Sequence, residues 1–277
     1  MPGHTREFDF ADEDFEALRR LVKQITGIHL SEQKRELVYG RLARRLRALQ
    51  LTSFAQYRRL LAEDNGREIV EFCNAITTNL TSFFREAHHF DFLREHLKSV
   101  AAAAGTRRVR IWSAACSTGE EPYSIAMTIR ESLSDLRGWD IRILATDLDS
   151  AVLEQARRGL YAAERLKGLE PQRRARFFRE QRCAEGISYV VSEELRSLIT
   201  FKQLNLMHPL PMRGPLQAVF CRNVVIYFDK DTQRDLFARI ALLQRPGDLL
   251  FLGHSESLFK VTDTYALLGR TVYRRVG

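Results

Sequence analysis

The sequence predicts an α/β protein: an N-terminal all-helical domain, then a doubly wound, mostly parallel sheet with a small inserted β-containing subdomain and a C-terminal antiparallel hairpin. Three observations support this. Residues 12–100 show only helical periodicity. From residue 109 onward, strand-like segments alternate with helical patterns. One connection between them, of about forty residues, is far longer than a doubly wound fold needs.

The helical pattern is clearest in EQKRELVYGRLARRLRALQ (32–50). Its apolar residues form one helical stripe: Val38, Leu42, Leu46 and Leu49. Arg41 and Arg45 lie beside this stripe, and Arg44 lies a little further round. Read alone, the arginines form a solvated flank whose stems cover apolar surface. The helical N-terminal domain is expected to span residues 1–98.

Positive charge is concentrated in one segment of this domain. The net charge of the chain is +8, and residues 17–62 hold eleven lysines and arginines against two acids, Glu32 and Glu36. A basic segment of this kind indicates an anionic partner: nucleic acid, a membrane surface or an acidic protein face.

The second domain, expected over residues 99–277, contains the strands. The segments that read as strands or strand ends are VRIWSAA (109–115), IRILATD (141–147), ITFKQLNL (199–206), AVFCRNVVIYF (218–228) and DLLFLGHS (248–255). Helical patterns between them imply parallel strands, with ligands bound at the carboxyl ends. The ending TYALLGRTVYRRV predicts an antiparallel hairpin.

The long connection is read as an inserted subdomain over about residues 160–198. It contains a predicted helix, PQRRARFFREQ, and a predicted strand, ISYVV.

The compartment is predicted to be the cytoplasm. The four cysteines lie far apart without a CxxC pair, which fits a reducing environment and argues against a zinc site: Cys73, Cys116, Cys183 and Cys221. No apolar run approaches the length of a membrane span, and the N-terminus is too polar for a signal peptide.

The loop in IWSAACSTGEEPYS (111–124) indicates the ligand. It has one glycine and neither GxGxxG nor GxxxxGK[ST], and Glu120 and Glu121 stand at the loop–helix junction. These carboxylates would repel a phosphate and tolerate a cation. Asp147, at the end of the next strand, can accept hydrogen bonds from both ribose hydroxyls. An adenosine ligand with a positive centre and no phosphate is S-adenosylmethionine; the alternative is that the two glutamates only cap the helix.

Six motifs in order closely resemble the chemotaxis receptor methyltransferase (CheR) family, over nearly the whole chain. They are TTNLTSFFREAHHFDFL (77–93), WSAACSTGEEPYSIAM (112–127), ATDLD (145–149), NLM (205–207), FCRNVVIYFD (220–229) and GHSES (253–257). The resemblance implies a methyltransferase sheet and a glutamate O-methyltransferase. The enzyme would use S-adenosylmethionine to esterify glutamates on the cytoplasmic helices of transmembrane chemoreceptors.

The resemblance also assigns residues. It implies cofactor binding by Asn79, Thr81, Arg85, Glu120, Asp147, Asn205, Leu206, Asn223 and Val224. Arg85 and Tyr227 would lie nearest the transferred methyl group; the less favoured alternative for Tyr227, which stands in an apolar run, is a core aromatic. Arg41, Arg44 and Arg45 become candidates for docking along the receptor's methylation helices, with no nucleic acid and no membrane insertion.

Other polar residues receive smaller roles. His88 and His89 have no further ligand at metal spacing, so no metal is expected. His254 and Glu256 in GHSES are assigned a supporting role only. Some family members hold a receptor's C-terminal peptide on the inserted subdomain, but the single glycine in REQRCAEGIS argues weakly against tethering here.

Two alternatives stay open: a methyltransferase of another acidic protein or of nucleic acid, and a non-catalytic receptor-binding adaptor. Amino-methylating enzymes of nucleic acids usually carry an Asp/Asn-Pro-Pro-aromatic motif after the fourth strand, where this chain has CRNVVIYF. An adaptor would not need the intact set Asn79, Arg85, Glu120, Asp147 and Asn223.

Overall fold

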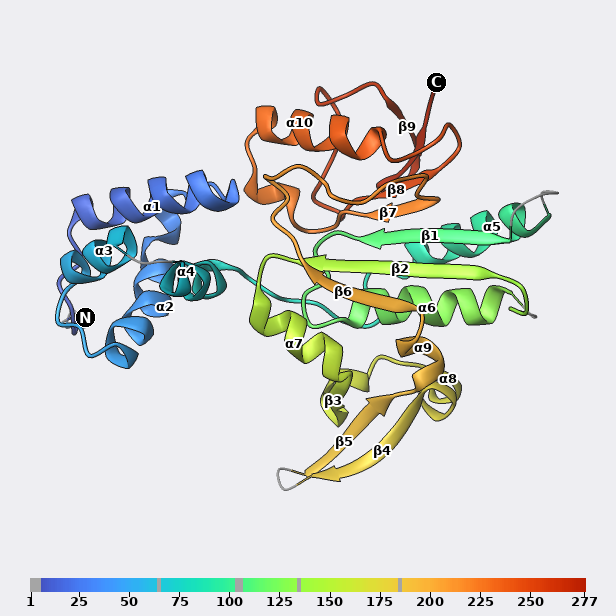
Figure 1. Cartoon of the computed structure of the whole chain (residues 1–277), viewed down its shortest axis with the longest axis horizontal. Coiled ribbons are helices and arrows are strands. Elements are labelled where there is room, and N and C mark those ends of the chain that lie inside the picture. The colour runs from blue at the N-terminus through green and yellow to red at the C-terminus, as the bar shows by residue number, and fades with distance from the viewer. Residues whose placement is uncertain (1–5, 64–65, 103–106, 134–135, 184–185) are drawn as a thin grey trace. The chain divides into compact units, whose positions relative to one another are not determined.

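The computed structural model describes residues 6–63, 66–102, 107–133, 136–183 and 186–277 (Figure 1). The chain forms two compact units. One comprises residues up to Thr78 together with Tyr227–Asp229, and the other comprises Asn79–Ile226 and Lys230–Gly277.

The first unit is helical, as the periodicity predicts. Its elements are α1 (Asp12–Thr26), η1 (Glu32–Lys34), α2 (Arg35–Ala48), α3 (Phe54–Glu63) and α4 (Arg67–Ile76). The predicted stripe of α2 faces the core, where Val38, Leu42 and Leu46 are buried. Helix α2 packs against α4, and α1 packs against α3.

Helix α5 (His88–Ala102) belongs to the second unit, although the sequence placed the domain boundary near residue 98. Its apolar residues Phe90, Leu93 and Leu97 share one core with Val109 and Ile111 of the sheet. Helical periodicity continues through α5 because the helix is amphipathic, and that pattern does not reveal which core it faces.

The second unit is built on a seven-stranded sheet in the order β6-β2-β1-β7-β8-β10-β9 (Figure 1). Its strands are β1 (Arg108–Ser113), β2 (Asp140–Asp147), β6 (Ile199–Gln203), β7 (Ala218–Phe220), β8 (Leu249–Phe251), β9 (Tyr265–Gly269) and β10 (Val272–Arg275). The first five are parallel to one another, whereas β10 is antiparallel to both β8 and β9. Both the mostly parallel sheet and the terminal antiparallel pair are therefore confirmed.

Helices α6 (Glu120–Ser132), α7 (Ser150–Arg158) and α10 (Lys230–Ala241) connect the strands. Helix α6 packs against α5, β2 and β6, and α7 packs against β2 and β6.

The apolar run 218–228 is not one strand. Strand β7 ends at Phe220, and the chain then forms a loop and the short 3-10 helix η3 (Val225–Tyr227). Periodicity cannot distinguish a buried strand from a buried loop when nearly every residue is apolar. The residues after Phe220 are thereby placed beyond the strand end, where ligands bind in such sheets.

The inserted subdomain forms a separate three-stranded antiparallel sheet in the order β3-β5-β4. It consists of β3 (Leu160–Ala162), η2 (Ala163–Leu166), α8 (Pro171–Phe177), β4 (Phe178–Cys183), β5 (Gly186–Val191) and α9 (Glu193–Arg196). The turn residues 184–185, on which the glycine argument about tethering partly depends, lie outside the described residues. Among the helices that the structure describes, none has the length and apolar character needed to cross a membrane.

Candidate functional site

The predicted binding residues of the second unit follow the carboxyl ends of parallel strands. The loops in question are 114–119 after β1, 148–149 after β2, 204–207 after β6, 221–224 after β7 and 252–256 after β8. Because parallel strands end at the same edge of a sheet, these loops gather there. We call this region the carboxyl edge.

Asp147 ends β2 and is almost completely buried. Its carboxylate oxygens accept hydrogen bonds from the backbone N–H groups of Ser117 at 2.8 Å and Asp149 at 3.0 Å. Burial raises the pKa of Asp147 to about 6, and the backbone hydrogen bonds oppose that increase. The β1 loop and the β2 end are thus joined through this carboxylate.

Asn79 is connected to the same corner. Its side-chain amide donates to Asp149 Oδ2 at 2.8 Å, and its carbonyl accepts from the Ser117 hydroxyl at 3.1 Å. Asp149 also caps α7 by accepting from the N–H groups of Ala151 and Val152. The structure therefore brings Asn79 and Asp147 to one place, while Thr81 lies partly exposed two residues further on.

Glu120 is completely buried at the start of α6. Its carboxylate accepts from the Thr118 hydroxyl at 2.6 Å and pairs with the guanidinium of Arg165 from η2. In this structure Arg165 is therefore the cation that Glu120 meets, a partner from the inserted subdomain that the sequence does not reveal.

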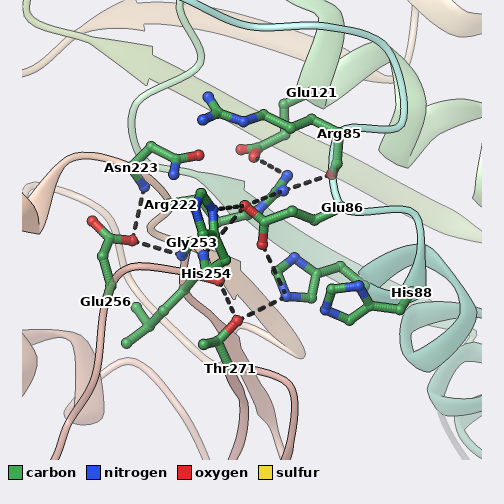
Figure 2. A network of polar contacts seen from close by, with 12 residues as sticks. Arg85, Glu86, His88, Glu121, Arg222, Asn223, Gly253, His254, Glu256 and Thr271 are labelled. Atoms are coloured by element: carbon green, nitrogen blue, oxygen red, sulfur yellow. Dashed lines mark hydrogen bonds and ion pairs between the residues drawn. The ribbon is translucent and has the colours of Figure 1, made fainter. Parts of the chain in front are cut away.

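The neighbouring Glu121 contacts a different part of the site (Figure 2). Its carboxylate accepts from the Ser113 hydroxyl at 2.7 Å and from Arg222 Nη1 at 2.9 Å. Arg222 also donates to the backbone carbonyl of Arg85 at 2.5 Å. Burial raises the pKa of Glu121, and the charge of Arg222 opposes this. Arg222 thus joins Glu121 to Arg85, and neither Glu121 nor Arg222 was singled out from the sequence for this contact.

Arg85 closes a short turn of its own, since its guanidinium donates to the carbonyl of Leu80 at 2.8 Å. The next residue, Glu86, lies 3.5 Å from Arg222 and 3.4 Å from the imidazole of His254.

Glu86, His88 and His89 could geometrically hold a cation, because their ligand atoms lie within 4.8 Å of one another. Both imidazoles, however, lie within hydrogen-bond distance of the Arg270 carbonyl, at 3.0 and 3.2 Å. Burial and the charge of Arg222 lower the pKa of His89 to about 3, so this imidazole is neutral. These contacts join α5 to the β9–β10 turn, and the guanidinium beside Glu86 disfavours a further cation.

Asn205 and Leu206 follow β6. The Asn205 side chain accepts from the N–H of Met207 at 3.0 Å, and the Leu206 carbonyl accepts from Arg239 at 2.8 Å. The N–H of Leu204 donates to the Asp147 carbonyl at 3.0 Å, which ties this loop to the end of β2.

Asn223 and Val224 lie between β7 and η3, and Asn223 has a left-handed backbone with φ of 57°. Their N–H groups donate to the carboxylate of Glu256 at 2.8 and 2.9 Å. Tyr227 is partly buried in η3, not in a strand, and its carbonyl accepts from the N–H of His29 at 2.8 Å. Its placement near the methyl group stays a prediction.

The three candidate docking arginines differ. Arg41 donates to the carbonyls of Ile76 and Thr77, at 2.6 and 2.7 Å, where α4 ends. Arg45 binds the carboxylate of Glu68 through two hydrogen bonds, at 3.0 and 2.6 Å. Arg44 is exposed, and no hydrogen bond or ion pair reaches it from the residues that the structure describes.

Comparison with known proteins identifies similar sequences along almost the entire chain. The family model described as CheR methyltransferase, all-alpha domain, matches residues 13–77, and the model described as CheR methyltransferase, SAM binding domain, matches residues 79–274. Chemotaxis protein methyltransferase 2 of Pseudomonas aeruginosa is 45% identical over 270 residues, which cover 97% of this chain and 95% of that protein. The chemotaxis protein methyltransferase of Salmonella typhimurium is 45% identical over 273 residues, covering 97% and 92%. That of Escherichia coli is 44% identical over 273 residues, covering 97% and 93%.

Proposed function

The chain belongs to the CheR methyltransferase family, and we propose that it esterifies glutamate side chains on the cytoplasmic helices of transmembrane chemoreceptors. As a member of that family it is an S-adenosylmethionine-dependent chemotaxis methyltransferase. The observation that carries the proposed cofactor binding is the carboxyl edge, where Asp147 and Asn79 both contact Ser117 and Asp149 beside a loop without a phosphate-binding motif.

The residues at this edge suit S-adenosylmethionine. Asp147 is held by backbone N–H groups and can still accept hydrogen bonds from ribose. The guanidinium of Arg85 suits the methionine carboxylate, with short polar side chains beside it. We assign the remaining cofactor contacts as the motifs indicate: Asn79 and Thr81 to the methionine end, Asn205 and Leu206 to the adenine, and Glu120 to the cationic part. Asn223 and Val224 are assigned to the cofactor as the loop after the fourth strand.

When bound, S-adenosylmethionine supplies an electrophilic methyl group on a positively charged sulfur. The protein must then align a glutamate carboxylate with it. With an ordinary pKa of about 4.3, the glutamate is already ionised at neutral pH, so we assign no general base. Arg85 and Tyr227 are proposed to orient the reacting groups. Excluding water helps because opposite charges disappear as the ester forms.

Receptor docking is proposed for the basic face of α2. Glutamate-bearing receptor helices are acidic, and an arginine-bearing helix attracts them. Arg44 has a guanidinium that is exposed to a partner, whereas Arg41 and Arg45 also hold α2 against α4. We therefore expect Arg44 to contribute most to the contact, and we place the reaction in the cytoplasm.

The acceptor is tested by incubating the protein with methyl-labelled S-adenosylmethionine and either chemoreceptor membranes or RNA. We expect label on the receptors that mild base releases as methanol, because the product is an ester. Receptors whose methylation-helix glutamates are replaced by alanine provide the control and should stay unlabelled. Label on RNA would support the nucleic-acid alternative, and binding to receptors without any label would support the adaptor.

The role of Arg85 is tested with Arg85→Ala. We expect kcat/KM to decrease roughly a hundredfold or more, because a charge-assisted contact to the cofactor is lost. The thermal midpoint should change little, since among the described residues the side chain donates one hydrogen bond, to the carbonyl of Leu80. Arg94→Ala, which removes an arginine paired with Asp91 on α5, serves as the matched control. Unchanged activity of Arg85→Ala would remove Arg85 from the site.

A further inference from the structure

The GHSES motif after β8 contains a buried carboxylate that the proposed reaction does not use. Glu256 has 4% of its surface exposed. Its Oε1 accepts from the N–H groups of Val224 at 2.9 Å, Val225 at 2.9 Å and Ile226 at 3.3 Å. Its Oε2 accepts from those of Asn223 at 2.8 Å and Gly253 at 2.6 Å. One carboxylate therefore receives five backbone hydrogen bonds. Figure 2 shows the two from Asn223 and Gly253.

Four of the five N–H groups are consecutive along the chain: those of Asn223 and Val224 lie in the loop before η3, and those of Val225 and Ile226 lie in η3 itself. The N–H groups at the start of a short helix, and those just before it, have no partner within that helix. A carboxylate satisfies them and is itself stabilised by them, since a buried charge without hydrogen bonds is costly. The loop conformation and the Glu256 carboxylate therefore depend on each other.

The conformation of Asn223 depends on the GHSES motif in two ways, through its backbone and through its side chain. Its left-handed φ of 57° is an uncommon backbone conformation that persists only where the surroundings hold it. Its side chain lies over Gly253, where an added Cβ would be only 2.3 Å from Asn223 Nδ2 and 2.9 Å from Cγ. The GHSES motif thus contributes both the carboxylate that fixes the backbone of Asn223 and the space that its side chain occupies.

We propose that Glu256 is a positioning residue for the cofactor: it holds Asn223 and Val224 in the conformation that binds the cofactor, without touching the cofactor itself. This inference rests on the proposed function, because Asn223 and Val224 are assigned there to the cofactor. With five N–H donors, the acceptor sites of the carboxylate are filled, and none is left for a ligand.

The experiment compares Glu256→Gln with Asp248→Asn. Glutamine is isosteric, but its amide NH2 must face either the Asn223 and Gly253 donors or the three other donors. Asp248 is a matched control: it is also a buried carboxylate, it accepts a backbone hydrogen bond from Arg245 at 2.6 Å, and it stands just before the opposite end of β8. Calorimetry with S-adenosylhomocysteine gives the Kd, steady-state kinetics give KM and kcat, and thermal unfolding gives Tm.

We expect Glu256→Gln to raise the Kd and the KM for the cofactor about ten- to a hundredfold, as the loss of hydrogen bonds to a charged group implies. The kcat at saturating cofactor should change less than about threefold, because the reacting groups are untouched. Asp248→Asn should lower Tm comparably and leave Kd within about twofold of the wild-type value.

If Glu256 only stabilises the fold, Glu256→Gln should lower Tm without changing the Kd for the cofactor. If both variants lower Tm and neither changes Kd, Glu256 does not position the cofactor loop, and the inference is overturned. If Glu256→Gln does not fold, Glu256→Asp decides, because it keeps the charge and draws the carboxylate back from the N–H groups of Asn223 and Val224 by one methylene. A raised Kd in that variant supports the inference, and an unchanged Kd rejects it. Wild-type protein that binds no S-adenosylhomocysteine would instead overturn the proposed function.

Discussion

Asp147 and Glu256 are both buried carboxylates at the carboxyl edge, but they differ in the number of backbone hydrogen bonds that they accept. Both are at least nine-tenths buried, and burial raises the pKa of each. Asp147 receives backbone hydrogen bonds from Ser117 and Asp149, whereas Glu256 receives five. A carboxylate offers about four lone-pair sites, so Asp147 retains capacity for a ligand and Glu256 retains none.

This difference separates a residue that binds from a residue that positions. Asp147 stands where a strand ends and its remaining lone pairs can meet ribose. Glu256 uses its lone pairs to shape the loop that carries Asn223 and Val224. Both should affect cofactor affinity, but only Asp147 should do so through direct contact.

The largest effect is expected for Asp147→Asn. The amide retains one acceptor oxygen and places an NH2 group against backbone N–H donors. This substitution therefore weakens the hydrogen bonds to ribose and disturbs the conformation of the loop. We expect the Kd for S-adenosylhomocysteine to increase about a hundredfold or more. Adenine alone lacks ribose, so we expect it to bind the wild type and Asp147→Asn with similar affinity. Wild-type affinity in Asp147→Asn would remove the direct role from Asp147.

A smaller effect is expected from pH. The pKa of Asp147 is raised to about 6, so the carboxyl gains a proton as the pH falls through that value. Protonation weakens acceptance from ribose, and we expect the Kd to increase about tenfold between pH 7 and pH 5. Calorimetry at several pH values measures this, and Asp147→Asn should lose the dependence.

Stability should change in the opposite direction. The pKa of Asp147 in the folded protein lies above its ordinary value of 3.8, so folding takes up a proton between about pH 4 and 6. The contribution of Asp147 to the stability of the ligand-free protein is therefore present below about pH 4 and declines as the pH rises to 6. Denaturant unfolding of the wild type and Asp147→Asn over this range should show a difference that changes with pH in this direction. A difference independent of pH would contradict the raised pKa.

The smallest effect is expected for the docking face. Arg44→Glu should lower the initial rate of receptor methylation about fivefold at low salt, and the deficit should shrink as added salt screens the charges. Cofactor Kd should not change. Arg59→Glu, which makes the same charge change at an exposed position of α3, is the control and should act weakly. Equal effects of the two variants would indicate net charge instead of a specific face.

The sequence alone was sufficient to predict the position of Asp147. An apolar strand that ends in an acid places that acid at the carboxyl edge of a parallel sheet. It could not distinguish Glu120 from Glu121. Adjacent residues on a helix point about 100° apart, and only packing decides that Glu120 meets Arg165 while Glu121 meets Arg222.

The sequence also did not predict which polar groups, distant along the chain, contact each other in the fold. The apolar run 218–228 resembles a strand until Glu256, distant in sequence, is known to accept its N–H groups. Likewise, the helical pattern places Arg41 and Arg45 nearer the apolar stripe than Arg44, but it does not reveal that they bind the end of α4 and Glu68. The pattern records which residues face a core, but not which polar groups of other elements they meet there.

The most direct test of the central claim, that the carboxyl edge binds S-adenosylmethionine, is a calorimetric comparison of three ligands with the wild-type protein. We expect S-adenosylhomocysteine to bind at one site per chain. NAD and ATP should bind far more weakly, because carboxylates stand where their phosphates would lie. Tight binding of NAD or ATP, together with no binding of S-adenosylhomocysteine, would contradict it.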